Sequence, residues 1–234
     1  MPDDHEVLPA GIINKENWIA ELPAEVRAAV EARMTRFTVE PGMPVKRAGE
    51  AATRIFQVES GFLSLIGLHA DGRQALITIY AAENCFSETA LIARRPHNHT
   101  TIAMTQSVMR QLDQSDFWDL YHRHAEIPEA LCRKFANAIS RQMASREQRA
   151  TQRLGQRIAS MFVNLSEHAS RPMQDGTIGI TLPLTQSNIA DLFDVTRQSV
   201  QREINQLRDW RIVEKRQSGW VVLEPSRLLR LCSY

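Results

Sequence analysis

Residues 185–223 read TQSNIADLFDVTRQSVQREINQLRDWRIVEKRQSGWVVL. Apolar residues recur at helical spacing over 186–193 and again over 197–210, which predicts two helices. Thr185 and Thr196 stand at the two helix starts, where a hydroxyl oxygen can accept a bond from a free backbone N–H. Because so few residues separate the helices, they must cross steeply. The spacing predicts a helix-turn-helix.

The turn and the segment that follows it support this prediction. Ala190 has a short side chain, which lets the second helix approach closely. Asp194 stands where a left-handed residue is expected, and Asp adopts that conformation more readily than most residues. Downstream, RIVEKRQSGWVVLE at 211–224 predicts two strands joined at residues 217–219. A helix-turn-helix followed by such a hairpin is a winged helix.

The second helix has a polar side that suits DNA, while Val200 and Ile204 fall on its apolar side. Its polar side carries donors for base edges, Arg for guanine and Gln for adenine: Arg197, Gln198, Gln201 and Arg202. Other polar side chains are candidates for phosphate contacts, which fix register and not sequence: Thr185, Gln186, Ser187, Thr196, Ser199, Lys215 and Arg216. The alternative interpretation is a winged helix that contacts protein and leaves these residues solvated.

A long helical pattern precedes the winged helix. It covers about 128–167, and a second helix begins near Thr151. Within its first part a stripe follows a 4-3-4 spacing, which is typical of helices that pair with a copy of themselves. The stripe is Leu131, Phe135, Ala138 and Gln142. The spacing predicts a homodimer along this helix.

The N-terminal half has a different pattern of apolar residues. A short helix is expected from Trp18 to Val30, and from Thr35 to Leu112 the chain consists of short apolar runs such as TRIFQV, GFLSLIGL, ALITIY and TIAMTQSVMRQL. Turn residues separate the runs, among them Asp71-Gly72, which predicts a tight hairpin. Several short strands at even spacing predict an antiparallel sandwich or barrel. The fold class is therefore α+β.

Charge and composition exclude several classes of protein. The 234 residues carry 28 Lys and Arg against 27 Asp and Glu, and the positive excess lies in 151–234, with 11 basic and 8 acidic residues. The sequence has no run of about 18 apolar residues, and its start MPDDHEVLPA lacks a basic, apolar signal segment. We therefore expect a cytoplasmic protein that does not bind membranes.

The sequence also lacks the usual marks of metal sites and of catalysis. Cys85, Cys132 and Cys232 include no CxxC pair, so we expect reduced, buried thiols and no metal. The sequence contains no P-loop, GxGxxG motif or nucleophile–base pattern. We therefore do not expect an enzyme.

In the order of these parts the chain resembles the CRP/FNR family of bacterial transcription regulators over nearly its whole length. The resemblance rests on PGMPVKRAGEAATRIFQVESGFLSLIGLHADGRQALITIY, on QRIASMFVNL, and on VTRQSVQRE, which looks like the family's S/T-R-E-T-V-x-R pattern. It implies an antiparallel β-roll of the cupin-like, cyclic-nucleotide-binding-like type at 1–126. It further implies a dimerisation helix and hinge at 127–150 and a winged helix DNA-binding domain at 151–234.

The resemblance also implies partners and base readers. The partners would be a palindromic double-stranded DNA operator, a second copy of the chain, RNA polymerase and a small-molecule effector. By the motif match Arg197, Gln198 and Arg202 would read bases. Gln198 replaces the family's Glu, and because Gln donates as well as accepts, the operator should differ from the familiar half-site.

The effector end departs further from the family. Its cyclic-nucleotide members bind ribose with a Gly-Glu pair and the cyclic phosphate with an Arg-Ser pair. Glu88 matches the Glu, but Ser87 replaces the Gly, and His99 and Thr100 fall near the expected Arg-Ser. A neutral His lacks the fixed charge and paired donors of Arg. The candidate effector pocket comprises Ser87, Glu88, Thr89, His99, Thr100 and Gln142, with Arg94 and Arg95 nearby.

A cyclic nucleotide is therefore a candidate cofactor with an incomplete match. An iron–sulfur cluster is disfavoured because the N-terminus has no Cys, and haem because isolated His residues such as His97 are more often solvated. Two further interpretations stay open. One is a constitutive DNA-binding regulator whose β-roll is a ligand-free dimer scaffold. The other is a cyclic-nucleotide-binding module that acts through protein contacts.

Overall fold

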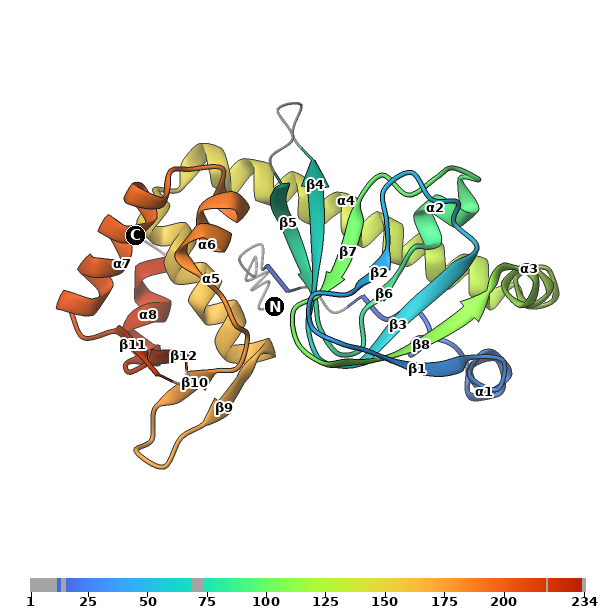
Figure 1. Ribbon diagram of the computed structural model, residues 1–234, viewed down its shortest axis with the longest axis horizontal. Coiled ribbons are helices and arrows are strands. Elements are labelled where there is room, and N and C mark those ends of the chain that lie inside the picture. Colours follow the sequence, from blue (N-terminus) through green and yellow to red (C-terminus); the bar gives the residue numbers. More distant parts are fainter. Residues whose placement is uncertain (1–11, 14–15, 69–73, 218, 233–234) are drawn as a thin grey trace, which may run out of the picture. The chain divides into compact units, whose positions relative to one another are not determined.

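The computed structural model describes residues 12–13, 16–68, 74–217 and 219–232 (Figure 1). The expected Asp71-Gly72 turn and Ser218 of the wing lie outside these residues. The chain forms two compact units: the first ends at Ala138, and the second begins at Ile139 and includes Ile12 and Ile13.

The first unit contains two antiparallel sheets, as the sequence predicts. Within the described residues each sheet has four strands. One sheet has the order β1 (Thr35–Val39), β8 (Ser107–Asp113), β3 (Arg54–Ser60) and β6 (Cys85–Phe86). The other has the order β2 (Pro44–Lys46), β7 (Thr100–Ala103), β4 (Leu63–Leu68) and β5 (Gln74–Tyr80).

The run TIAMTQSVMRQL, which reads as one strand, is divided between the two sheets. β7 pairs with β4 and β2, whereas β8 pairs with β1 and β3. Gly61, between β3 and β4, has a φ of 95°. A Cβ at this position would lie 2.8 Å from the carbonyl oxygen of Gln106, so the close approach requires glycine.

Helices flank the sheets of this unit: α1 (Ala24–Glu31), α2 (Glu88–Ile92), α3 (Gln114–Arg123) and the start of α4 (Glu126–Thr151). The first helix begins later than the apolar spacing indicates. Trp18 lies in turns before it, because Pro23 at the N-cap disfavours helical backbone in the residue that precedes it. Trp18 is nevertheless fully buried, in a core with Ile55 and Phe117.

The second unit contains the rest of α4 and the predicted winged helix. Its elements are α5 (Leu154–His168), β9 (Ser170–Pro172), β10 (Ile178–Ile180), α6 (Gln186–Phe193), α7 (Arg197–Asp209), β11 (Val213–Arg216), β12 (Gly219–Val222) and α8 (Pro225–Cys232). The strands form a sheet of order β11-β12-β10-β9. The sequence patterns above did not predict β9 or α8. Both belong to the packing of α5, which contacts α7, α8 and β9.

The described residues contain neither a membrane-spanning helix nor a metal site, and their cysteines are free. No helix among the described residues is long and apolar enough to cross a membrane. The same residues include no group of His, Cys, Asp and Glu that could hold a metal ion. All the cysteines are free, but only Cys85 is buried, and Cys132 is exposed, which corrects the expectation of buried thiols.

Candidate nucleic-acid interface

The predicted helix caps are present at both helices of the helix-turn-helix. The Thr185 hydroxyl accepts a bond from the Asn188 N–H at 3.1 Å, and the Thr196 hydroxyl accepts one from the Ser199 N–H at 3.1 Å. Asp194 ends α6 in the left-handed conformation, with a φ of 53°. These local bonds fix where each helix starts and how the chain turns between them.

Helix α7 is divided into an apolar and a polar side. Val200, Ile204 and Leu207 are buried. The predicted base readers on the opposite side are all exposed: Arg197, Gln198, Gln201 and Arg202. A depression of about 630 Å³ runs along this side and is lined by Gln198, Gln201, Arg202, Asn205, Gln206, Asp209 and Trp210. Asn205, four residues after Gln201, could have been included from helical spacing alone.

Arg202 forms an ion pair with the next residue of α7. Its guanidinium donates to Glu203 Oε1 through Nε at 3.2 Å and Nη2 at 3.1 Å. The Arg202 side chain is 77% exposed, whereas that of Glu203 is only 17% exposed. A Cβ at Gly155, in the first turn of α5, would lie 2.9 Å from Glu203 Oε2. The missing side chain of Gly155 therefore makes room for the carboxylate that orients Arg202.

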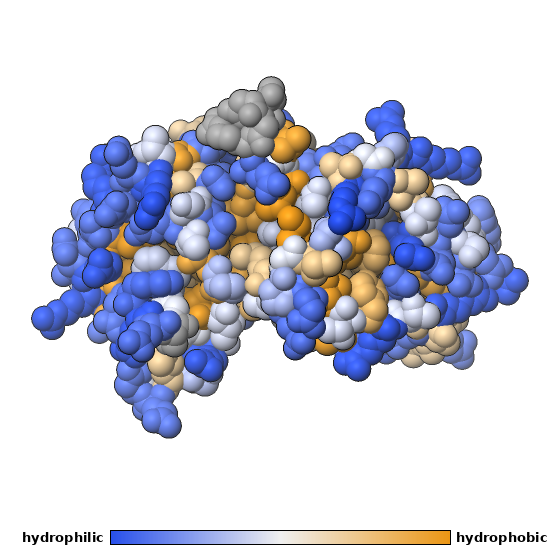
Figure 2. Space-filling view, viewed as in Figure 1, coloured by the Kyte–Doolittle hydropathy of each residue, from blue (hydrophilic) through white to orange (hydrophobic). Residues whose placement is uncertain are grey.

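The candidate phosphate contacts differ in how far they reach solvent. Thr185, Ser187 and Thr196 are exposed, while Gln186 and Ser199 are half-buried. The second unit has a mostly hydrophilic visible surface, at the left of Figure 2. These side chains and the backbone N–H groups at the starts of α6 and α7 suit an anionic backbone.

The two basic residues of the wing behave differently. Lys215 is exposed, and its Nζ lies 4.8 Å from the centre of the Trp220 ring. Arg216 instead bonds Asp175 Oδ2 at 2.8 Å and the Glu214 carboxylate. Hydrogen bonds from Thr177 and Arg216 lower the pKa of Asp175 to about 2. The carboxylates of Asp175 and Glu214 in turn raise the pKa of Arg216. Arg216, predicted to contact phosphate, is therefore already neutralised.

Glu88 is not placed to bind a ribose. It is 2% exposed, and its Oε1 accepts from Lys134 Nζ at 2.9 Å and from Trp18 Nε1 at 2.9 Å. Lys134 also donates to the Cys85 carbonyl at 2.6 Å. The residue predicted to face an effector thus forms a buried ion pair with α4, and the sequence separation of the partners hides this pair.

Ser87 has a backbone conformation that favours glycine, the residue expected here from the family pattern. Its φ is 83°, in the left-handed region. Its hydroxyl is buried and has no hydrogen-bond partner in the described part of the chain. A serine at this point is strained and contributes no bond that offsets the strain.

The other candidate effector residues each have their own surroundings. The Thr100 hydroxyl accepts from the Ala48 N–H at 3.1 Å, Thr89 is exposed, and Gln142 lies on an exposed side of α4. Lys46, which no motif of the sequence indicates, is 8% exposed and donates to the His99 carbonyl at 2.7 Å. Burial lowers its pKa to about 8, and burial and Lys46 together lower the pKa of His99.

Comparison with known protein families agrees with both units. Residues 36–124 match the family model of the cyclic nucleotide-binding domain, and residues 156–231 match that of the Crp-like helix-turn-helix domain. The chain belongs to the CRP/FNR family of transcription regulators. Domains and relatives of this CRP/FNR regulator are those of DNA-binding proteins that are not enzymes.

Individual relatives of this CRP/FNR regulator are distant. It is 22% identical over 202 residues to the CRP-like cAMP-activated global transcriptional regulator of Mycobacterium tuberculosis, covering 86% of each chain. It is 22% identical over 197 residues to the nitrogen fixation regulation protein FixK of Rhizobium meliloti, covering 84% of this chain and 86% of that one. A CRP-family transcriptional regulator from Thermus thermophilus has the same fold, with a TM-score of 0.69, 23% identity and coverage of 86% and 97%.

The long helix of this CRP/FNR regulator presents a different stripe from the predicted one. Leu131 is buried and Phe135 is partly buried against the core of their own unit, so this stripe leaves little apolar surface for a second copy. Ala138 is half-buried and Gln142 is exposed. One position along, a second stripe with the same 4-3-4 spacing is exposed: Cys132, Ala136, Ile139 at 56% and Met143 at 66%.

Proposed function

We propose that the chain is a homodimeric, sequence-specific DNA-binding regulator that places α7 in the major groove. The observation that carries the proposal is the polar side of α7, with four exposed Arg and Gln side chains opposite the buried Val200, Ile204 and Leu207. Such side chains distinguish base pairs in the major groove, which admits a helix. The base readers are Arg197, Gln198, Gln201 and Arg202.

The backbone contacts come from the two helix starts and from the wing. Phosphates bound there fix the register of α7 on the duplex. Arg216 is left out of this set because Asp175 and Glu214 already bind it. The proposed phosphate contacts are Thr185, Gln186, Ser187, Thr196, Ser199 and Lys215.

We infer that two copies pair through the exposed stripe of α4, which replaces the stripe that begins at Leu131. Ile139 and Met143 are large apolar side chains that water otherwise surrounds. A heptad-like spacing lets them meet the same residues of a second helix. A two-fold dimer places two recognition helices about 34 Å apart, which matches a palindromic operator. RNA polymerase is the expected protein partner of such a regulator.

The effector is a separate question. Similarity does not decide it, because one relative is named as cAMP-activated and another, equally identical, as a regulator of nitrogen fixation. We propose that any effector acts without Glu88 as a ribose ligand, because Lys134 and Trp18 already use that carboxylate. An effector would act by favouring the DNA-competent state over the other.

Arg202→Ala tests the proposed orientation of α7. The substitution should weaken binding to the selected operator by about 1–3 kcal/mol and relax the preference at one base pair. The operator is first selected from random duplexes by the full-length protein, and affinities are then measured by fluorescence anisotropy. An Arg202→Ala variant with unchanged operator affinity and unchanged base preference contradicts the orientation. A half-site that binds as tightly as the full palindrome contradicts the dimer.

Two wing variants form the control pair. Lys215→Ala should weaken all duplexes alike and lower the salt dependence of log K by about one. Arg216→Ala should leave that slope unchanged, because the removed charge is already paired with carboxylates. Each variant removes one positive charge from the wing. A change in the salt dependence for Lys215→Ala alone would therefore report a lost phosphate contact and not the lower net charge.

Cyclic AMP should leave operator affinity unchanged. Glu88 is engaged by Lys134, and no arginine occupies the position of the family's phosphate ligand. The measurement is the anisotropy titration repeated with cyclic AMP at increasing concentrations. A rise in operator affinity of about tenfold, equivalent to a coupling free energy of about 1.4 kcal/mol, would show that the nucleotide is the effector.

A further inference from the structure

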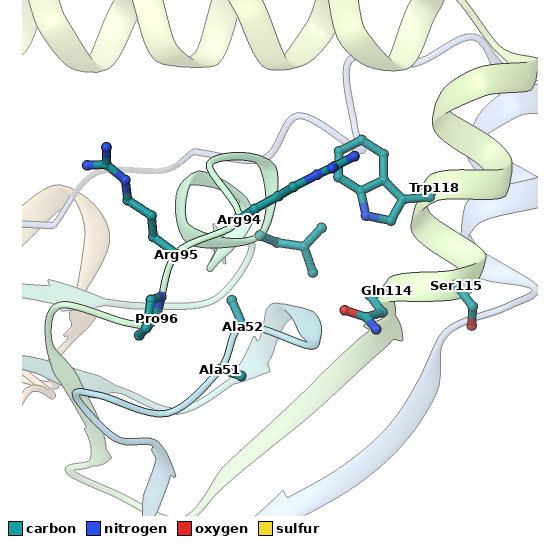
Figure 3. A pocket seen from close by; sticks show the side chains of 9 residues that line it. Ala51, Ala52, Arg94, Arg95, Pro96, Gln114, Ser115 and Trp118 are labelled. Atoms are coloured by element: carbon teal, nitrogen blue, oxygen red, sulfur yellow. The ribbon is translucent and has the colours of Figure 1, made fainter.

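A cavity of about 460 Å³ lies in the first unit, between the end of α2 and the start of α3 (Figure 3). Its size is in the range of small-molecule sites. The six residues predicted for the effector pocket do not line it, but Arg94 and Arg95, which lie near that pocket in the sequence, do. The lining residues are Ala51, Ala52, Leu91, Arg94, Arg95, Pro96, Gln114, Ser115 and Trp118.

The cavity carries positive charge that the structure leaves uncompensated. Arg94 extends from the end of α2 over the ring of Trp118, with its guanidinium carbon 5.9 Å from the ring centre. Neither Arg94 nor Arg95 has an ion-pair partner in the described ranges of the chain. Other arginines of the unit do, for example Arg36 with Glu59 and Arg54 with Asp113.

The backbone of Arg94 is an independent indication. Its φ is 51°, and the N–H groups of Arg94 and Arg95 bond the carbonyls of Leu91 and Ala90 at 3.2 and 3.0 Å. This is the Schellman pattern of a helix end, in which the left-handed residue is usually glycine because a Cβ is strained there. The helix end does not need an arginine at this position. Strain retained at a cavity wall indicates that the side chain has a role.

We propose that this cavity binds a small organic anion, with a carboxylate or phosphate group on an apolar, planar body. Arg94 would hold the anionic group, since a guanidinium donates two parallel bonds to either oxyanion. The Gln114 amide turns toward the same space and offers a further donor (Figure 3). Trp118 and Leu91 supply an apolar wall for the body of the ligand.

The site is separate from the proposed DNA-binding function, and α3 connects it to the long helix α4. Gln114 and Trp118 belong to α3, and only His124 and Ala125 separate α3 from α4. A ligand that bridges Arg94 and Gln114 ties the end of α2 to the start of α3. It would therefore act on the segment that leads directly into the long helix.

Calorimetric titration of the full-length protein tests the proposal with three probes. Phenyl phosphate and benzoate carry the anionic group on a planar body, and benzamide is the neutral counterpart. At least one of the two anions should bind about tenfold or more tightly than benzamide. Which anion binds better distinguishes a phosphate ligand from a carboxylate ligand. Because no DNA is present, the result does not depend on the DNA-binding proposal.

Arg94→Gly separates binding from folding. Glycine relieves the left-handed strain, so the melting temperature should stay unchanged or rise, while the affinity for the anion falls about tenfold or more. Arg36→Gln removes one positive charge from the same unit outside the cavity and should leave anion binding unchanged. The proposal is overturned if wild type binds neither anion at millimolar concentrations, if it binds benzamide equally well, or if Arg94→Gly binds the anion like wild type.

Discussion

Lys134→Met lowers the free energy of unfolding by about 3–5 kcal/mol. The side chains of Lys134 and Glu88 are 6% and 2% exposed, so removing the ammonium leaves a buried carboxylate for which the described residues provide only the Trp18 N–H as a donor. Methionine keeps the approximate length of the lysine stem, so the loss reports the missing charge and its bonds to Glu88 and the Cys85 carbonyl, and not a large cavity. Urea unfolding at neutral pH measures the effect, and hydrogen exchange should locate it around α2 and α4.

The double variant Glu88→Gln with Lys134→Met is the matched control. It removes both charges, and glutamine can still accept the bond from Trp18. Replacing a buried pair as a whole costs far less than breaking it, so the double variant should recover most of the lost stability. A single-variant loss below about 1 kcal/mol, or a double variant no more stable than the single one, would show that the pair is not what holds α4 to α2.

Trp220→Ala lowers the stability of the second unit by about 3–5 kcal/mol and abolishes operator binding with it. Trp220 is buried on β12, and its Nε1 donates to the Leu184 carbonyl at 2.9 Å. Its ring packs edge-on against the ring of Phe162, with the two ring centres 5.6 Å apart. One side chain thus joins the wing to α5 and to the segment before α6. Hydrogen exchange should show lost protection in 154–232 and unchanged protection in the first unit.

Trp220→Phe separates the ring from its hydrogen bond. Phenylalanine retains the contact with Phe162 but leaves the buried Leu184 carbonyl without its donor, which costs about 1–3 kcal/mol. Operator binding should survive in this variant at low temperature. Equal losses for the Phe and Ala variants would mean that the bond, and not the packing of the ring, holds the wing.

Local features of the fold followed from the sequence. The caps at Thr185 and Thr196 and the left-handed Asp194 depend on residues within a few positions, so residue type and spacing suffice to predict them. The sequence did not predict which of two stripes on α4 is exposed. Leu131 and Cys132 each start a 4-3-4 series, and only the core of the first unit decides which series is covered.

Most features of the sites depend on contacts between distant residues. Glu88 and Lys134 lie 46 positions apart, and Arg216 and Asp175 lie 41 apart. The family pattern singles out Glu88, and the place of Arg216 in the wing singles out Arg216, but neither shows that the residue has a partner from another element. The cavity beside Arg94 was missed for the same reason, because its walls come from three separate segments of the chain.

Gly155 is a position outside α7 that affects the proposed recognition of the operator. Glu203 keeps its present contact with Arg202 while the first turn of α5 leaves space for its carboxylate, and a Cβ at Gly155 would push that carboxylate aside. If Arg202 reads a base as proposed, a substitution at Gly155 would move its partner and thereby change base preference, although Gly155 lies outside α7. Under that proposal, exchanging α7 alone would leave out a position that contacts the partner of a base reader, so libraries meant to change the operator should vary residue 155 together with α7.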